Sequence, residues 1–389
     1  MKRKFGILLV ACLLMGLLPV WVQGADLQVP AKSALLMELE TGTVLYEANA
    51  HEPLAPASVT KIMTMLLIME AIDAGSIGWE DTVTASETAA AKGGSQVYLK
   101  VGETMTVRDM VKSIAVSSAN DCACAMAEHL AGSEEAFVAR MNQRAGELGM
   151  ENTHFVNCTG LDDDPAAKDH RTSAYDIALM SRELMVHHPD IAQFTTIWMD
   201  TIRDGTFGLS NTNKMVRFYQ GATGLKTGFT SGAGYCLSAT ARREEMGLVA
   251  VVMGSDTSKE RFAACKQLLD YGFANFALVK PEPEESLTVP VTLGKETSVT
   301  AVPSESGTLL VDKGQKNAVS VQVDVSPGVK APVSRGQRLG TMTIRSGEQV
   351  LKQIPLVATQ TVEKLGWWEI FTQVLRRLSF SKISVGEGL

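Results

Sequence analysis

Alternating apolar and polar positions stand out first at residues 33–47, on either side of the turn-forming triplet Glu40-Thr41-Gly42. Alternation with a period of two around such a turn predicts a β-hairpin. The pattern then changes at residues 58–74, where nearly every position is apolar until Gly75. A segment that is apolar on almost all sides predicts a buried helix, and the glycine predicts its end.

Further helices are predicted where a capping residue precedes an amphipathic stretch. Thr106 and Asp109 have the spacing of a capping box, which predicts a helix that starts there. Helical patterns also cover residues 121–130, 133–148, 173–186 and 257–277. Three apolar runs joined by short connections, at 223–229, 235–241 and 248–254, predict neighbouring antiparallel strands. The sequence therefore predicts an α+β domain in which helices flank an antiparallel sheet.

The composition changes at Pro281-Glu-Pro-Glu-Glu. Beyond it, short alternating segments such as 287–291 and 319–325 are separated by turns rich in glycine, proline and serine. This pattern predicts a small all-β domain. We expect a first domain at residues 25–280, a small β-rich domain at 281–361 and a separate tail at 362–389.

The tail carries an amphipathic pattern at residues 364–382. Its apolar face contains Trp367, Ile370, Phe371, Val374, Leu375 and Leu378, and basic residues lie elsewhere or at the ends. An aromatic-rich apolar face with basic flanks is typical of a helix that lies in a membrane interface. The alternative is an ordinary amphipathic helix that packs on its own domain.

The N-terminus has the layout of a secretory signal peptide. Residues 1–4 are basic, residues 5–22 are almost wholly apolar, and small residues follow at Gly24 and Ala25. We expect residues 1–24 to be removed on export, by cleavage near Gly24 or Ala25. A retained N-terminal membrane helix is the alternative, because the apolar run is close to spanning length.

Composition excludes several classes of function. The 389 residues carry a formal net charge of -7, which argues against nucleic acid as a partner because that requires a basic face. No spacing of cysteine and histidine resembles a zinc site, and we expect no metal or organic cofactor. The odd number of cysteines beyond the N-terminal segment predicts buried thiols and no disulfide framework: Cys122, Cys124, Cys158, Cys236 and Cys265.

The candidate chemistry begins with Ser58 and Lys61. A Ser-x-x-Lys sequence is weak evidence by itself, and a second copy occurs at residues 379–382. At 58–61, however, the two residues lie at the start of an apolar helix, on one face. A lysine shielded there can act as a base for the serine, and nearby backbone N–H groups can stabilise an oxyanion. The alternative is structural, with Ser58 as an N-cap and Lys61 as a snorkelling side chain, whose apolar stem is buried while its amine reaches solvent.

Two further groups follow downstream. Ser118 and Asn120 lie between predicted helices, where the hydroxyl can relay a proton and the amide can hold a peptide bond. Lys226, Thr227 and Gly228 lie on a predicted strand, where a cation, a hydroxyl and a glycine suit a peptide that ends in a carboxylate. Each group alone is also compatible with an ordinary loop or strand end.

Taken together and in this order, the three groups resemble the Ser-x-x-Lys, Ser-x-Asn and Lys-Thr-Gly motifs of serine penicillin-binding proteins and β-lactamases. The resemblance covers about residues 30–277 and is strongest to the low-molecular-mass D-alanyl-D-alanine carboxypeptidases of the peptidase S11 type. It implies a β-lactamase/transpeptidase-like catalytic domain, a small β domain and an amphipathic membrane anchor. The implied partners are peptidoglycan stem peptides that end in D-Ala-D-Ala and, as covalent inhibitors, β-lactams.

The resemblance also implies roles for individual residues. Ser58 is the nucleophile and Lys61 its base, and Ser118 passes a proton toward the leaving amine with help from Lys226. Asn120 holds the substrate amide. Thr227 and Lys226 bind the terminal carboxylate beside Gly228, and the N–H groups of Ser58 and Phe229 form the oxyanion hole. In relatives an arginine often precedes the Lys-Thr-Gly strand, and here Lys214 and Arg217 are the candidates for its place.

Two rival functions remain open at this point. A β-lactamase of the common class needs a glutamate in the loop that corresponds to residues 152–182, and this stretch contains aspartates but no glutamate. A non-catalytic penicillin sensor or wall-binding module is the other rival, although all three motifs are intact. We therefore expect a serine DD-carboxypeptidase.

Overall fold

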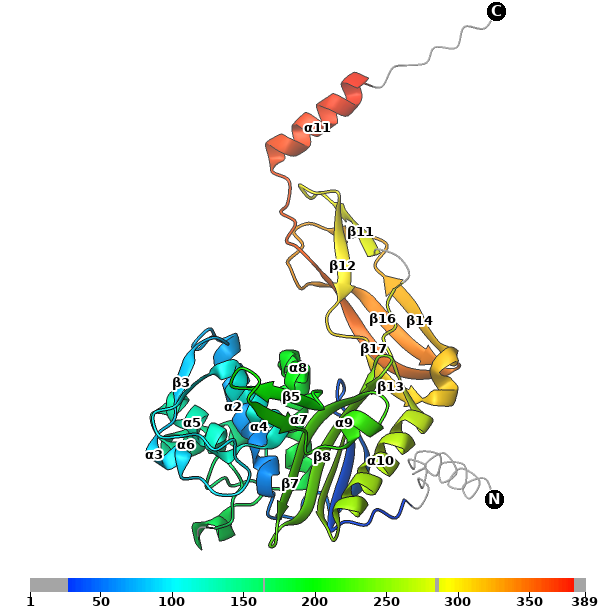
Figure 1. The fold of residues 1–389 in the computed structure, drawn as a ribbon. Helices are drawn as coiled ribbons and strands as arrows, with labels where there is room; N and C mark the ends of the chain where they lie inside the picture. The colour runs from blue at the N-terminus through cyan, green and yellow to red at the C-terminus, as the bar shows by residue number, and fades with distance from the viewer. Residues whose placement is uncertain (1–26, 164, 284–286, 381–389) are drawn as a thin grey trace, which may run out of the picture.

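The computed structural model describes residues 27–163, 165–283 and 287–380, and Figure 1 shows their arrangement. A mixed helix and sheet domain is followed by an elongated β domain, and a helix lies at the far end. This confirms the predicted α+β class with a β-rich second part. The predicted signal peptide falls on residues outside the described ranges.

A five-stranded antiparallel sheet forms the centre of the first domain. Its strands are, in spatial order, β2 (Val44–Ala48), β1 (Ser33–Glu38), β9 (Met246–Ser255), β8 (Gly234–Arg243) and β7 (Ala222–Thr230). The hairpin of β1 and β2 and the antiparallel succession of β7, β8 and β9 confirm the sequence predictions. The pairing of β1 with β9 joins the two ends of the domain and leaves β7 at an edge.

Both faces of this sheet are covered by helices, so its strands are buried on both sides. Along β9, Val249 and Val251 enter the core on one face, whereas Leu248 and Ala250 enter the core on the other. The first face is covered by the buried helices, and α10 packs on the second. The longer helices are α2 (Lys61–Asp73), α4 (Val107–Ser117), α5 (Asn120–Ala131), α6 (Glu134–Glu147), α7 (Ala174–His187) and α10 (Ser258–Asn275).

Short elements complete the first domain. They are the 3₁₀ turns η2 (Ala57–Thr60), η3 (Pro165–Asp169) and η4 (Pro189–Ile191), the strands β3 (Thr82–Thr84), β4 (Thr104–Thr106), β5 (Met199–Ile202) and β6 (Phe207–Ser210), and the helices α3 (Glu87–Ala90), α8 (Ala192–Thr195) and α9 (Met215–Phe218). β3 pairs with β4 and β5 with β6, which gives two small two-stranded antiparallel sheets.

The helix starts agree with the predicted caps, with one correction. Thr106 accepts a hydrogen bond from the Asp109 N–H at the start of α4, and Thr257 with Glu260 forms a complete capping box on α10. Ser58, by contrast, is not an N-cap: it lies inside η2, and α2 begins only at Lys61. The helix start that the apolar pattern predicted is therefore a tight turn followed by a helix.

The second domain is built from strands. A six-stranded sheet has the order β14 (Val319–Val325), β16 (Arg338–Ser346), β17 (Gln349–Ala358), β12 (Ser298–Pro303), β11 (Leu287–Thr292) and β15 (Val329–Lys330), and η5 (Lys313–Ala318) precedes β14. β10 (Phe276–Val279) pairs with β13 (Leu309–Asp312), so a strand before residue 281 bonds to one well beyond it. The link between the two parts is therefore a hydrogen-bonded strand pair.

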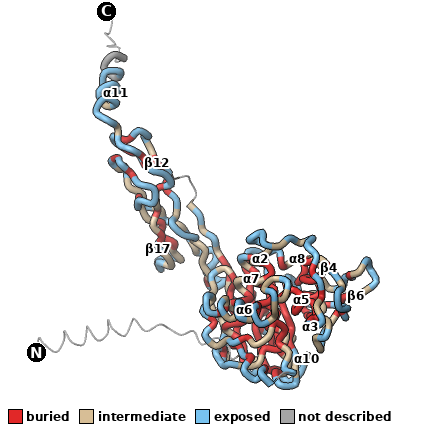
Figure 2. The backbone as a smooth tube through the Cα atoms, turned by 90° about the vertical axis from the view of Figure 1, so that its left-hand side faces the viewer, coloured by how far each residue is buried: buried red, intermediate tan, exposed pale blue. Residues whose placement is uncertain are grey.

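The tail forms helix α11 (Trp367–Phe380), within the predicted range of 364–382. Figure 2 shows it largely exposed at the end of the β domain, away from the buried residues of either domain. Trp367 is 68% exposed and Trp368 70%, and the ring of Trp367 stacks on that of Phe371 at 5.5 Å. These aromatic side chains are therefore exposed and do not pack on the preceding domain, which was the alternative prediction.

Candidate active site

Ser58 and Lys61 form the first pair of the site. Lys61 Nζ lies 3.0 Å from Ser58 Oγ and donates a second hydrogen bond to the Thr159 carbonyl at 2.8 Å. The lysine is fully buried, and this loss of solvent lowers its pKa to about 7, although the nearby Cys158 and Asp121 act in the opposite direction. Near neutral pH a large fraction of Lys61 is therefore uncharged and able to take the proton of Ser58.

The turn that carries Ser58 packs against the segment around Gly160. Thr60 Oγ1 donates to the Ala57 carbonyl and lies 2.8 Å from His170 Nε2. Burial lowers the pKa of His170 to about 4, so this imidazole is neutral at physiological pH. Gly160 sits directly against the turn with φ +79°, and a Cβ there would lie 1.8 Å from the Ala57 carbonyl oxygen.

We expect Gly160→Ala to displace this turn. The added methyl group overlaps the Ala57 carbonyl, which costs about 1–3 kcal/mol by overpacking, and the left-handed backbone adds about 1–2 kcal/mol. The melting temperature and the rate of penicillin labelling should both fall. Gly149→Ala is the matched control, because Gly149 has φ +72° with nothing within 4 Å of its Cβ position. Equal losses in the two variants would contradict the proposed packing.

Ser118 and Lys226 form the second pair. Ser118 ends α4 in a left-handed conformation with φ 62°, and its Oγ accepts a hydrogen bond from Lys226 Nζ at 2.8 Å. Burial lowers the pKa of Lys226 well below its usual range, and the positive charges of Lys61 and Arg261 add to this effect. The charge of Lys61 thus acts on Lys226, so the two serine–lysine pairs influence each other electrostatically.

Asn120 lies at the start of α5 and is 1% exposed. Its Nδ2 donates to the Gly93 carbonyl at 2.7 Å, whereas its buried Oδ1 has no partner among the described residues. A buried acceptor without a donor costs free energy. A hydrogen bond from a substrate N–H to Asn120 Oδ1 therefore contributes more to binding than a hydrogen bond at an exposed position would. The next residue, Asp121, accepts from the Val97 and Leu99 N–H groups and so fixes the segment that follows Gly93.

Strand β7 forms one wall of the site. A Cβ on Gly228 would lie 2.7 Å from the Pro56 carbonyl and 3.1 Å from the Ser58 nitrogen, so only glycine allows this close approach. Side chains alternate along a strand, and the Phe229 ring accordingly stacks on Tyr235 at 4.3 Å and is 53% exposed. Thr227 Oγ1 donates to Thr212 Oγ1 at 2.7 Å.

Several contacts of the site were not predictable from the motifs. Lys61 relies on the Thr159 carbonyl, 98 residues away in the chain. Arg261 of α10 donates to the Gly228 carbonyl at 2.9 Å from behind the sheet. Neither contact has a local sequence signal. Arg217, a candidate for the arginine that precedes the Lys-Thr-Gly strand in relatives, stacks on the rings of Trp198 and Phe218.

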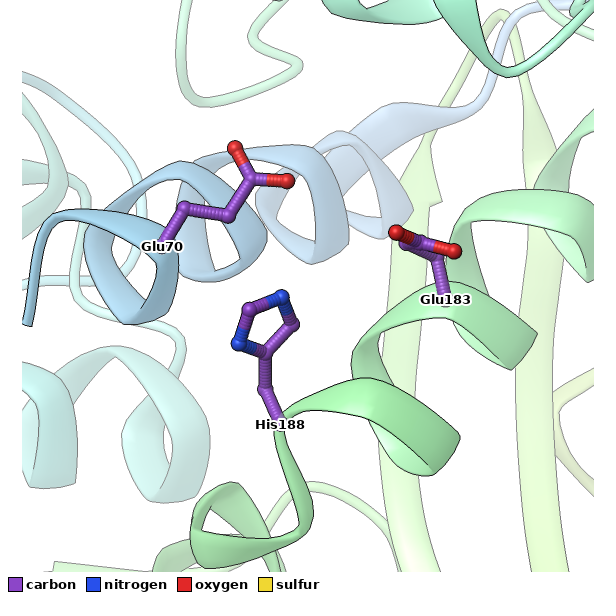
Figure 3. A group of neighbouring side chains, drawn as sticks. All are labelled: Glu70, Glu183 and His188. Atoms are coloured by element: carbon purple, nitrogen blue, oxygen red, sulfur yellow. The ribbon is translucent and has the colours of Figure 1, made fainter. Parts of the chain in front are cut away.

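One cluster outside the site has the composition of a metal centre. Figure 3 shows Glu70, Glu183 and His188, with the imidazole between the two carboxylates. Arg144 pairs with Glu70 at 2.7 Å and with Glu183 at 2.6 Å, so each of these carboxylates already has a cationic partner. His188 Nδ1 in turn contacts Asp73. The ion pairs of Arg144 join α2, α6 and α7. Elsewhere, the five cysteines among the described residues are all free and buried, and none of them forms a disulfide.

The fold and these two serine–lysine pairs define the class of serine penicillin-binding proteins. Comparison with known families is more specific. Residues 21–257 match the D-alanyl-D-alanine carboxypeptidase family, and residues 278–364 match the C-terminal domain of penicillin-binding protein 5. The chain belongs to the D-alanyl-D-alanine carboxypeptidase family, a family of serine peptidases.

Individual relatives extend this result over most of the chain. D-alanyl-D-alanine carboxypeptidase DacF of Bacillus subtilis is 42% identical over 380 residues, which cover 94% of this chain and 96% of that protein. Penicillin-binding protein 5 of Haemophilus influenzae superposes with a TM-score of 0.74 at 29% identity and covers 87% of this chain. In that comparison 99% of the other chain is covered. Penicillin-binding protein D2 of Listeria monocytogenes, solved in its ampicillin-bound form, is 33% identical with a TM-score of 0.58 and covers 64% of this chain and 100% of its own.

Proposed function

We propose that Ser58 removes the terminal D-alanine from peptidoglycan stem pentapeptides through an acyl-enzyme. The observation that carries this proposal is the buried Lys61, whose Nζ lies 3.0 Å from Ser58 Oγ and whose pKa is about 7. The uncharged amine takes the Ser58 proton as Oγ attacks the carbonyl between the two D-alanines. The N–H groups of Ser58 and Phe229 stabilise the oxyanion that develops.

Departure of the terminal D-alanine, which completes acylation, uses the other pair. Ser118, bonded to Lys226, delivers a proton to the leaving D-alanine nitrogen as the carbon–nitrogen bond breaks. Lys226 and Thr227 hold the terminal carboxylate before it leaves, and Asn120 Oδ1 accepts from the substrate amide. Water then attacks the Ser58 ester, which releases the stem tetrapeptide and restores the serine.

Incubation of the purified protein with a pentapeptide ending in D-Ala-D-Ala tests this proposal. We expect release of one D-alanine per peptide, measured by a D-amino-acid oxidase assay. A peptide ending in L-Ala-L-Ala is the control and should release none. Absence of D-alanine together with normal penicillin labelling would instead support a non-catalytic sensor.

The same serine is expected to react with β-lactams, as the ampicillin-bound relative indicates for its own chain. Penicillin should acylate Ser58 and leave slowly, because residues 152–182 contain no glutamate to activate a deacylating water. The measurement is the rate at which labelled penicillin is lost from the isolated acyl-enzyme. Rapid turnover of penicillin would favour the β-lactamase alternative.

The export and anchoring of this chain are also part of the proposal. We place the mature protein at the outer face of the cytoplasmic membrane, after cleavage near residue 24, with α11 lying on the lipid surface. Within the described residues, no helix has the length and apolarity needed to cross a bilayer. The exposed ring cluster of Trp367, Trp368 and Phe371 on α11 supports an interfacial position.

Deletion of residues 364–389 is expected to release the protein from membranes without loss of peptidase activity. The physical reason is that α11 contributes the exposed aromatic surface, whereas the site lies in the first domain. Fractionation of cells that express the signal-cleaved deletion variant, with D-alanine release from each fraction, measures both effects. Membrane binding that is unchanged by the deletion would contradict the anchor.

A further inference from the structure

A largely buried ion pair between Glu134 and Lys92 has no part in the reaction described above. Glu134 is the first residue of α6, and its Oε2 lies 2.5 Å from Lys92 Nζ, with the two side chains 13% and 21% exposed. Burial favours the neutral acid, but the hydrogen bond and the positive charge of Lys92 hold the pKa of Glu134 below its ordinary value. Glu134 is therefore an ionised carboxylate at neutral pH, and its second oxygen is available to another partner.

That second oxygen binds the residue before Thr159. Glu134 Oε1 accepts hydrogen bonds from the Cys158 N–H and from the Cys158 thiol, each at 3.2 Å. Cys158 is fully buried, so its N–H depends on the carboxylate as its acceptor. The Cys158 carbonyl accepts from Thr64 Oγ1 of α2 at 2.6 Å. Cys158 is thus held between α6 on its N–H side and α2 on its carbonyl side.

The peptide group that binds the Lys61 amine follows directly in the chain. The Thr159 carbonyl accepts from Lys61 Nζ at 2.8 Å. The N–H of the same peptide group belongs to Gly160 and donates to Asn157 Oδ1 at 2.7 Å, and the Thr159 N–H donates to the same oxygen at 3.1 Å. This turn is bonded at two successive N–H groups, so a displacement of Cys158 also displaces the Thr159 carbonyl.

Glu134 also has an ordinary structural explanation. An acidic side chain in the first turn of a helix stabilises the helix through its dipole, and both Glu134 and Glu135 lie in the first turn of α6. Glu135 is exposed, whereas Glu134 reaches a main-chain N–H 24 residues further along the chain. Two neighbouring glutamates therefore share the effect on the helix, and Glu134 alone is bonded to the segment that holds Lys61.

We propose that Glu134 is a positioning residue for the general base Lys61. The carboxylate, oriented by Lys92, fixes Cys158, and the Thr159 carbonyl then holds the Lys61 amine within reach of the serine hydroxyl. This inference rests on the proposed function, because it takes Lys61 as the base. A misplacement of about 1 Å can cost about 10²-fold in rate, so a hydrogen bond remote from the substrate can matter for acylation.

The first-order rate constant for acylation of Ser58 by a saturating chromogenic cephalosporin measures this effect. We expect Glu134→Ala to lower the constant by about 10- to 100-fold, because the Cys158 N–H loses its acceptor and the turn shifts. Glu134→Gln keeps an oxygen that can accept from this N–H and should recover most of the wild-type rate. A purely structural role would lower the melting temperature and the labelled fraction, but a first-order constant does not depend on how much protein is folded.

Two further variants complete the experiment. Glu135→Ala is the matched control, because it removes an acidic side chain from the same helical turn, and it should keep the wild-type constant. Lys92→Met removes the partner that orients the carboxylate and should also slow acylation. It replaces Glu134→Ala if that variant yields no protein that can be labelled, and an unchanged constant in Lys92→Met would then overturn the inference.

The outcomes separate this inference from the proposed function. A wild-type constant in labelled Glu134→Ala, or an equally slow Glu134→Gln, would overturn the role of Glu134 and leave D-alanine release by the wild type untouched. Failure of the wild type to release D-alanine from the pentapeptide would overturn the proposed function, whereas the cephalosporin rates would still decide whether Glu134 positions the base.

Discussion

Replacing Ser58 by alanine is expected to abolish both D-alanine release and penicillin labelling, with a loss of more than about 10⁴-fold in each rate. Ser58 Oγ is the atom that forms the ester, and the hydroxyl lies 3.0 Å from the base Lys61. A stopped assay for D-alanine and gel detection of a fluorescent penicillin measure the two losses separately.

The second Ser-x-x-Lys sequence gives a matched control. Ser379→Ala changes the same residue type in the same local motif, but residue 379 belongs to helix α11 of the tail. We expect this variant to keep both activities. Unfolding of Ser58→Ala is detected by circular dichroism, and the missing hydrogen bond alone costs only about 0.5–1.5 kcal/mol. A folded Ser58→Ala protein that still binds penicillin covalently would rule out this nucleophile.

Replacing Lys61 by methionine is expected to slow acylation by about 10²–10⁴-fold, the usual contribution of a general base. Methionine keeps an unbranched apolar stem in the buried position, so the loss reports the missing amine. In the wild type, the acylation rate should fall about tenfold per pH unit below pH 7, because protonated Lys61 cannot accept the Ser58 proton and its pKa is about 7. Above that pH, Lys61 is uncharged and no longer limits the rate.

Stopped-flow acylation by a chromogenic β-lactam between pH 5 and 9 measures this profile. The Lys61→Met variant should lose the step near pH 7 together with most of its rate. Lys259→Met is the control, because Lys259 is an exposed lysine of α10, and it should retain the wild-type profile. A wild-type profile that is flat through pH 7 would show that another group activates Ser58.

The regular elements could be predicted because their signals are local. The alternation of the β1–β2 hairpin, the capping residues of α4 and α10 and the apolar run of α2 each lie within one segment. The three motifs were equally local, and their order along the chain was enough to indicate the family. The position of Ser58 in a 3₁₀ turn was missed, because an apolar pattern fixes which side is buried more firmly than it fixes the first residue of a helix.

The remaining features of the site depend on contacts between distant segments. The Thr159 carbonyl reaches Lys61 from 98 residues away, and Arg261 reaches Gly228 from 33 residues away. Such contacts arise when a whole sheet and its helices pack, so no window of sequence contains them. For the same reason the pairing of β10 with β13 could not be read from the change in composition at Pro281.

The sequence by itself determined which residue types were available for acyl transfer and in what order they follow one another. The tertiary structure alone decided what those residues can do. Lys61 has a pKa near neutrality because packing removes its solvent, and Ser58 is within its reach because Gly160 and Gly228 allow two distant segments to approach the turn. Desolvation and close approach are properties of the packed core, and a linear motif carries neither.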